Sequence, residues 1–150
     1  MFNLPPNPRS RRLARLARRL AAYGFSLAFT LSLLPGCQSR VVPVGADGQP
    51  ASFVLGTLTT DLGPEYDVLT IQAAAEQALL RRGYVITRRT STQREARLTG
   101  EYAGGRDGAA CDITVFNLHT GSRVQITVRP LGDLAESQSV MDATLTILGK

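Results

Sequence analysis

The chain has 150 residues, a formal net charge of +5 at pH 7 and two cysteines. All of the excess positive charge lies in residues 1–36, which hold six arginines and no acidic residue, so residues 37–150, with 11 basic and 12 acidic residues, have a net charge near −1. Both signs are scattered there, without a basic stripe interleaved with aromatic residues, and this composition argues against a nucleic-acid partner.

Residues 9–34 have the pattern of an export signal. Arginines are concentrated in residues 9–19, and residues 20–34 form an apolar run of about 15 residues. A membrane-spanning helix needs about 20 apolar residues, and Pro35-Gly36 ends this run abruptly. We therefore expect residues 1–36 to be a signal peptide. An uncleaved inner-membrane anchor and a secreted protein cleaved elsewhere are the alternatives.

The segment Leu34-Pro35-Gly36-Cys37 resembles the lipobox of bacterial lipoproteins, in which an apolar residue stands three positions before a cysteine and a small residue directly before it. The resemblance implies that a lipoprotein signal peptidase recognises these positions, and that Cys37 carries lipid and becomes the first residue. Gln38 follows the cysteine in place of an aspartate. By the sorting rule of enterobacterial lipoproteins, this implies the periplasmic face of the outer membrane.

Residues 37–52 are predicted to be a lipidated cysteine followed by a flexible tether. Pro43, Gly45, Gly48 and Pro50 are residue types typical of loops. A flexible coil of this length reaches roughly 20 Å. We therefore expect the folded domain, residues 53–150, to stand off the bilayer.

Residues 53–60 are apolar and β-branched, which predicts a strand. A helix is predicted to follow, with Pro64 at its first position, Glu65 and Asp67 near the positive end of its dipole, and Gly83 as its C-terminal cap. Its apolar residues recur at helical spacing, namely Val68, Ile71, Ala75, Ala78 and Leu79.

From residue 84 the hydrophobic period changes to two, which predicts strands at residues 84–90, 95–103, 111–118 and 123–129. The inward-facing side chains are expected to be Ala96, Leu98, Gly100, Tyr102, Val124, Ile126 and Val128. Cys111 falls in one of these strands and is expected to be a buried thiol, because lipid would consume the sulfur of Cys37.

A second helix is predicted after residue 132. Asp133 and Glu136 have the spacing of a capping box, in which Asp133 accepts from a helical amide and Glu136 returns to the amide of the cap. Its apolar stripe is expected to be Leu134, Met141, Leu145 and Leu148, with Gly149 after it. The order β-α-β-β-β-β-α predicts an α+β two-layer sandwich: an antiparallel sheet of about five strands with two helices on one face.

Several of these features occur together in one family. The chain has a lipobox, a strand, an Ala-rich helix ending in Leu79-Leu80-Arg81-Arg82-Gly83-Tyr84, and Gly132-Asp133 with Ser139 at the opening of the last helix. In these respects residues 37–150 resemble the short bacterial lipoproteins that carry domain of unknown function 3568. The resemblance implies a shared fold and a location in the cell envelope, and it supplies no catalytic residues.

The residues that could carry chemistry are isolated. His119 is the only histidine and falls in a predicted turn. Ser122, Ser137 and Ser139 lack the surroundings of a nucleophile elbow. Asp61, Glu65 and Asp67 could hold a cation, but acidic residues near a helix N-terminus are the favoured interpretation. The glycine-rich residues 104–108 lack the helix and lysine of a phosphate loop. We therefore expect no enzyme activity, no cofactor and no metal site.

The sequence favours a membrane-anchored lipoprotein that acts as a non-catalytic module and binds a protein or another envelope component. The sheet edge, the polar sheet face and the loop at residues 104–110 are the candidate surfaces. The alternative is a periplasmic protein that binds a small hydrophobic or lipid ligand between its helices and its sheet. The sequence does not determine the oligomeric state.

Overall fold

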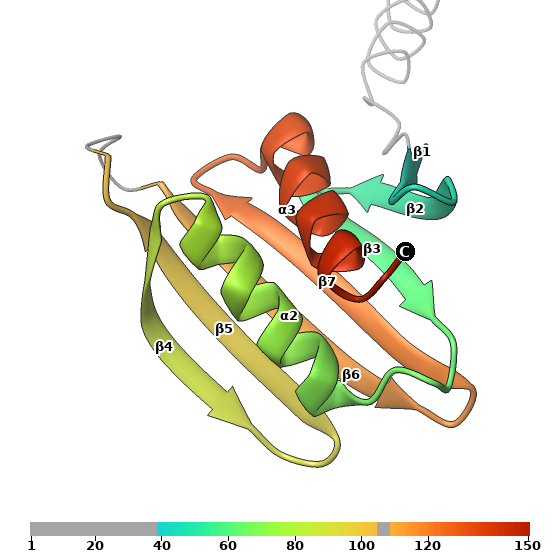
Figure 1. Cartoon of the computed structure of the whole chain (residues 1–150). Coiled ribbons are helices and arrows are strands. Elements are labelled where there is room, and N and C mark those ends of the chain that lie inside the picture. The colour runs from blue at the N-terminus through green and yellow to red at the C-terminus, as the bar shows by residue number, and fades with distance from the viewer. Residues whose placement is uncertain (1–38, 105–108) are drawn as a thin grey trace, which may run out of the picture. The chain divides into compact units, whose positions relative to one another are not determined.

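The computed structural model of the chain describes residues 39–104 and 109–150. These residues form one antiparallel sheet of seven strands with two helices packed on the same face (Figure 1). The strands are β1 (Arg40–Val44), β2 (Gln49–Val54), β3 (Thr57–Leu62), β4 (Tyr84–Ser91), β5 (Glu95–Tyr102), β6 (Ala110–Leu118) and β7 (Gly121–Arg129), and the helices are α2 (Val68–Arg81) and α3 (Leu134–Ile147).

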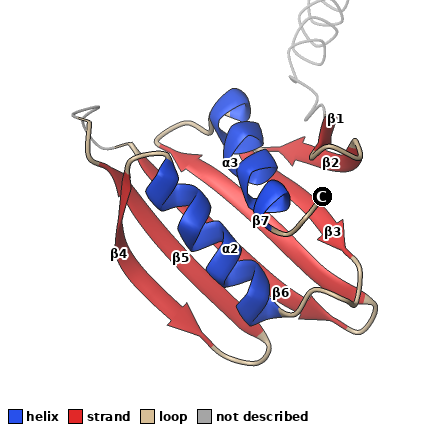
Figure 2. Cartoon of the chain, in the orientation of Figure 1, coloured by secondary structure: helices blue, strands red, loops and turns tan. Residues whose placement is uncertain are grey.

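The predicted α+β architecture with both helices on one sheet face is confirmed (Figure 2). The predicted strand count and order are wrong. The order along the chain is β-β-β-α-β-β-β-β-α, and the order across the sheet is β1-β2-β3-β7-β6-β5-β4. The four strands predicted after residue 83 correspond to β4–β7, so the differences lie before the first helix.

The predicted tether at residues 37–52 is wrong from Arg40 onward, because β1 and β2 form a hairpin there. The buried side chains of Val42 and Val44 face the core, and Ala51 on β2 does the same. Pro43 lies opposite Pro50 in this hairpin. Pro43 is tolerated because β1 is an edge strand, and Pro50 is tolerated because it precedes Ser52–Val54, the residues of β2 that pair with β3.

Helix α3 also holds the β1–β2 hairpin in place. Gln138 Nε2 donates to the Pro43 carbonyl oxygen at 3.1 Å, and the Gly45 amide donates to Asp142 Oδ1 at 2.7 Å. These bonds tie the first structured residues of the chain to its last helix. The hairpin is therefore part of the folded domain.

The predicted strand at residues 53–60 is divided by a two-residue turn. Leu55 and Gly56 both have positive φ, +49° and +80°, and the chain reverses direction between β2 and β3. Positive φ at both central residues is the hairpin geometry whose twist matches that of the flanking strands, and Asn-Gly is its favoured sequence. Because leucine stands where asparagine is usual, the sequence pattern does not indicate this turn.

Helix α2 begins at Val68, four residues later than predicted from Pro64. Asp67 is its N-cap, and the Asp67 carboxylate accepts from the Thr70 amide at 2.7 Å. Gly83 follows the last turn at a φ of +82°, as predicted. The predicted apolar residues are all buried in the core, which lies between the two helices and the sheet.

The pairing of the strands defines two ends of the domain. The start of β1, the turn at Leu55, the α2–β4 turn and the β7–α3 loop share one end, which we call the Arg40 end. The β6–β7 turn, which contains His119, lies at the other end, the His119 end. In the part of the chain that the structure describes, no helix is long and apolar enough to cross a membrane.

Candidate functional site

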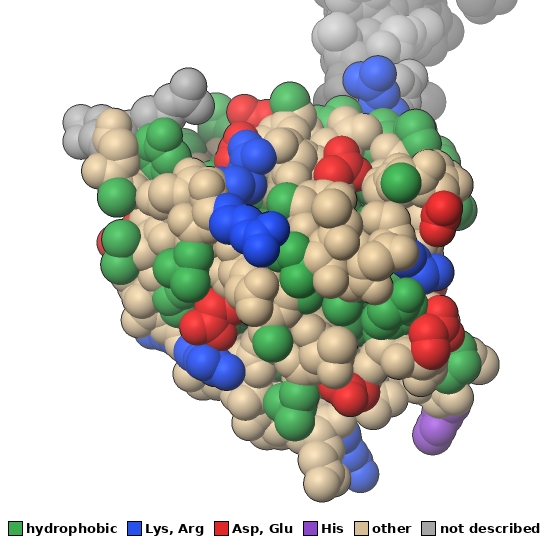
Figure 3. All heavy atoms as spheres, in the orientation of Figure 1, with side chains coloured by type: hydrophobic (Ala, Val, Ile, Leu, Met, Phe, Trp, Pro, Cys, Tyr) green, Lys and Arg blue, Asp and Glu red, His purple; other side chains and the backbone are tan. Residues whose placement is uncertain are grey.

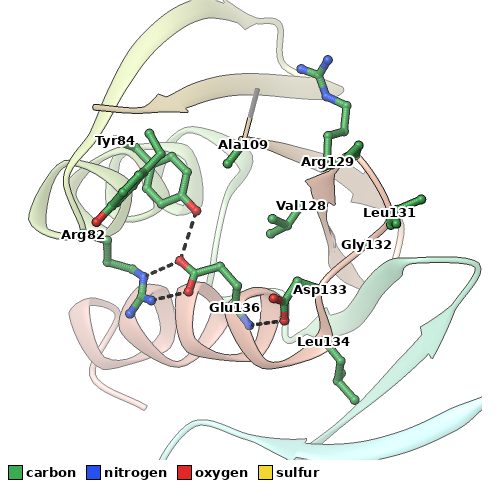
Figure 4. Close-up of a pocket in the computed structure, with 12 residues that line it drawn as sticks. Arg82, Tyr84, Ala109, Val128, Arg129, Leu131, Gly132, Asp133, Leu134 and Glu136 are labelled. Carbon is green, nitrogen blue, oxygen red and sulfur yellow. Dashed lines mark hydrogen bonds and ion pairs between the residues drawn. The ribbon is translucent and has the colours of Figure 1, made fainter. Parts of the chain in front are cut away.

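A pocket of about 710 Å³ opens at the Arg40 end, where α3 begins. The apolar part of its lining includes Tyr102, Val128 and Leu134. Arg82 and Glu136 form a charged corner (Figure 4). The lining residues come from the α2–β4 turn, the ends of β5 and β7, the residue before β6, the β7–α3 loop and the first turn of α3. We call this cavity the α3 pocket.

The charged corner is a closed hydrogen-bonded network. Arg82 Nη2 donates to Glu136 Oε2 at 2.8 Å and Arg82 Nε to Glu136 Oε1 at 3.2 Å, so the ion pair is bidentate. Tyr84 Oη donates to the same Oε1 at 3.1 Å (Figure 4). Arg82 Nη1 also donates to Ser139 Oγ. A bidentate guanidinium–carboxylate pair fixes both side chains in one orientation, so this wall of the pocket is preorganised.

Local sequence positions each member of the network. Arg82 is the C-cap of α2, and Gly83 with its positive φ turns the chain into β4, which places Tyr84 at the Arg40 end. Asp133 caps α3 by accepting from the Glu136 amide at 3.0 Å, which confirms the predicted N-cap. The predicted return bond of the capping box is absent from the described contacts. The Glu136 carboxylate instead binds Arg82 and Tyr84, because the ion pair across the pocket satisfies it better.

Two potential nucleophiles near the pocket are held protonated. Burial, together with the charge of Glu136, raises the pKa of the Tyr84 phenol well above its ordinary value. Burial also raises the pKa of the Cys111 thiol to about 12, and the negative charge of Asp112 adds to the effect. Cys111 has no exposed surface, as predicted for a core thiol. Neither group forms its reactive anion near neutral pH.

The structure disperses the other candidate residues. His119 is exposed at the His119 end, away from the α3 pocket. Ser122 is buried and donates to the Tyr66 carbonyl oxygen at 2.9 Å, and Ser139 accepts from Arg82. Ser137 is buried in α3, and its hydroxyl has no hydrogen-bond partner among the described residues. These side chains do not form one site.

The three acidic residues near the first turn have separate partners. Asp61 pairs with Arg123 at 2.7 Å, Asp67 caps α2, and Glu65 lies 3.8 Å from the ammonium group of Lys150. Within residues 39–104 and 109–150, no group of three or more histidine, cysteine, aspartate or glutamate side chains has the arrangement of a metal site. Asp67 therefore lies at the N-terminus of α2, but as its N-cap and not inside its first turn as predicted, while Asp61 and Glu65 form ion pairs.

The residues of the predicted lipidation signal, Leu34, Pro35, Gly36, Cys37 and Gln38, lie outside the described residues. Residues 105–108 of the predicted docking loop also lie outside them. On the helix-bearing face, basic and acidic side chains are interspersed with hydrophobic ones and do not gather into one patch of a single sign (Figure 3).

A family model described as protein of unknown function DUF3568 matches residues 21–146, which is most of the chain. The chain belongs to this family. The folded part described above is therefore a DUF3568 domain. No curated protein matches the chain.

The α3 pocket of this DUF3568 domain was not predicted. Arg82 and Glu136 are 54 residues apart, and each was assigned only to a helix terminus. The one available signal was an arginine directly before the glycine that ends α2, since a basic residue there either stabilises the helix end or reaches a distant partner. No local pattern identifies that partner.

Proposed function

We propose that this chain is a lipid-anchored protein of the bacterial envelope whose DUF3568 domain is a non-catalytic binding module, with the α3 pocket as its binding site. On this proposal residues 1–36 are a signal peptide, Cys37 carries the lipid, and Gln38 directs the protein to the periplasmic face of the outer membrane. The family match supports it, because the match begins at residue 21 and so includes residues 21–34 of the apolar run and the Leu34–Cys37 segment that follows.

The α3 pocket is the observation that carries the binding role. Its volume of about 710 Å³ is in the range of ligand sites. Its lining combines apolar side chains with charged ones, namely Arg82, Arg129, Asp133 and Glu136. The charged corner favours binding over turnover, because the side chains of Arg82, Glu136 and Tyr84 are already hydrogen-bonded to one another.

A protein partner in the envelope is the proposed occupant. An apolar side chain of the partner would lie against Tyr102, Val128 and Leu134, which line the pocket. The side chains of Arg82 and Glu136 remain 28% and 29% exposed, so each can still contact a polar group of the partner at the pocket wall. Such a combination of apolar anchor and polar rim is typical of protein interfaces.

A small hydrophobic or lipid ligand is the second candidate, and the apolar walls of the α3 pocket favour it. The space between α2 and the sheet is occupied by fully buried side chains, including Ile71, Ala75 and Leu79. A ligand of this kind is therefore expected in the α3 pocket at the end of the two layers, and not deep between helix and sheet.

The anchor is tested by growing cells that express the full chain with an alkyne-bearing fatty acid. We expect the protein to be labelled, and we expect the Cys37→Ser variant to be expressed without label. Label that persists in Cys37→Ser, or no label in the parent chain, would contradict the lipid anchor.

The binding site is tested by a photo-crosslinking amino acid in place of Ala109, which lines the α3 pocket, in the native envelope. Ala73, an exposed alanine on α2, is the matched control position. We expect one stoichiometric adduct from position 109 and none from position 73. An adduct with the mass of a protein supports the first occupant, and one with the mass of a lipid supports the second. Equal yields from both positions would rule out the pocket as the binding site.

A further inference from the structure

Exposed hydrophobic side chains gather at the Arg40 end of the domain. Those found there among the described residues are Val41, Val54, Leu55, Leu80, Val85, Tyr102 and Leu131. Leu69, at the start of α2, is the large hydrophobic residue that is exposed at the opposite end of the described domain. Leu131 and Leu55 are 91% and 85% exposed, and a concentration of this kind marks an interaction surface.

Leu55 and Leu131 are carried by two turns that touch. A Cβ atom built on Gly132 would lie 2.2 Å from the Gly56 Cα, and one built on Gly56 would lie 3.3 Å from the Leu131 carbonyl oxygen. Only glycines allow the β2–β3 turn and the β7–α3 loop to approach this closely. The two leucines therefore project from one continuous surface at the Arg40 end.

The turn at Leu55 is unfavourable for a leucine in water. Its φ of +49° belongs to the left-handed region, where the Cβ of most residues crowds the backbone and asparagine is better tolerated. Leu55 contributes little to packing within the domain, because it is 85% exposed. Neither the backbone conformation nor exposure to water favours leucine at this position. A contact with something outside the domain would explain why the turn carries an apolar side chain.

The chain leading into β1 limits how far this surface can lie from a lipid on Cys37. Arg40, the first residue of β1, follows Cys37 by three residues, so their Cα atoms are at most roughly 11 Å apart. The β7 strand has nine residues, which places the His119 end roughly 30 Å farther along the sheet. A lipid on Cys37 would therefore bring the Arg40 end, and not the His119 end, to the membrane.

We propose that the Arg40 end of the DUF3568 domain rests on the bilayer that holds the lipid of Cys37, with Leu55 and Leu131 inserted at the lipid–water interface. This inference rests on the proposed lipidation of Cys37. Because the α3 pocket opens at the same end and Leu131 lines it, the inference favours the second candidate occupant, a lipid, over a protein partner. It replaces the expected stand-off from the membrane, since residues 40–44 form β1 and leave only two residues, Gln38 and Ser39, between the lipidated cysteine and the sheet.

The test uses the full chain, expressed in a host that lipidates it and reconstituted into vesicles of phosphatidylethanolamine and phosphatidylglycerol. An environment-sensitive fluorophore is attached at Leu131→Cys or at Leu55→Cys, with Leu69→Cys as the matched control at the opposite end. Cys111 is fully buried, so its thiol does not react in the folded protein. We expect blue-shifted emission and quenching by spin-labelled lipid at positions 131 and 55, and neither change at position 69.

Two readouts separate the failure of this inference from the failure of the proposed function. Intact mass reports lipid on Cys37, and an unmodified Cys37 would also take up a second fluorophore. One outcome is that the lipid is present and the protein floats with the vesicles, but the labels at positions 131 and 55 are no more quenched than the label at 69. This outcome leaves the lipid anchor supported and overturns the membrane contact. Quenching at all three positions also overturns it. If Cys37 carries no lipid, both proposals fail.

Discussion

Leu55 combines a left-handed backbone with an exposed apolar side chain, and both features destabilise the folded protein in water. Asparagine tolerates the left-handed region better, so Leu55→Asn is expected to raise the free energy of unfolding by about 1 kcal/mol. Urea unfolding of the two proteins in the absence of membranes measures this difference.

Leu69→Asn is the matched control for that substitution. Leu69 is also exposed but lies in α2, where asparagine is a weaker helix former than leucine, so this variant should be less stable than the parent. If Leu55→Asn is destabilising by a similar amount, then Leu55 contributes to the fold and its apolar side chain needs no external contact.

The sequence analysis assigned individual residues of the α3 pocket to helix ends, but it did not predict that they form one site. Asp133 was predicted as a cap from its spacing to Glu136, and this prediction is confirmed because capping depends on residues within one turn. The pairing of Glu136 with Arg82 joins two helices that are separated by four strands. Such contacts depend on how elements pack, which local spacing does not encode.

At the scale of elements, β1 is the largest correction to the sequence interpretation, and it can be tested directly. Val44 is 1% exposed and Val41, on the same strand, is 69% exposed. Val44→Ala is expected to lower the free energy of unfolding by about 2 kcal/mol through lost burial and the resulting cavity. Val41→Ala should change it by less than about 0.5 kcal/mol. Chemical denaturation of both variants decides between a strand and a tether, because a tether would make both changes equally small.

The elements after residue 62 were predicted well because their signals are local. The strands β5–β7 show clear alternation, and the C-terminal end of α2 and both ends of α3 are marked by residues with capping function. The start of α2 was misplaced because Pro64 suggested a first helical position, whereas the Asp67 side chain caps the helix at Val68. Strand β1 and most of β2 were missed because Pro43 and Pro50, together with Gly45 and Gly48 in the turn between the two strands, have the composition of a loop.

At the scale of the whole molecule, two carboxylates connect stability to pH. The hydrogen bonds from Arg123 hold the pKa of Asp61 below its ordinary value of 3.8, and the Thr70 amide does the same for Asp67. Both groups therefore favour the folded state above about pH 4, and this contribution is lost as pH falls through their lower folded-state pKa values.

We expect the free energy of unfolding to be nearly constant between about pH 5 and 7 and to fall below about pH 4. Urea titrations over this pH range measure the dependence. Asp61→Asn removes one of the two groups, so its stability should fall less steeply in acid than that of the parent chain. A parent curve that rises toward low pH would contradict the assigned direction of both pKa shifts.

The sequence by itself determined the α+β class, the four strands that follow α2, the capping of α3 by Asp133 and the buried state of Cys111, because periodicity and capping act over a few residues. Only the tertiary structure decided that residues 40–54 belong to the sheet, that Arg82 meets Glu136 beside a pocket, and that Leu55 and Leu131 share one surface at the end where β1 begins. Each of these depends on strand pairing or on contact between elements far apart in the chain, where the energy of packing outweighs local preference.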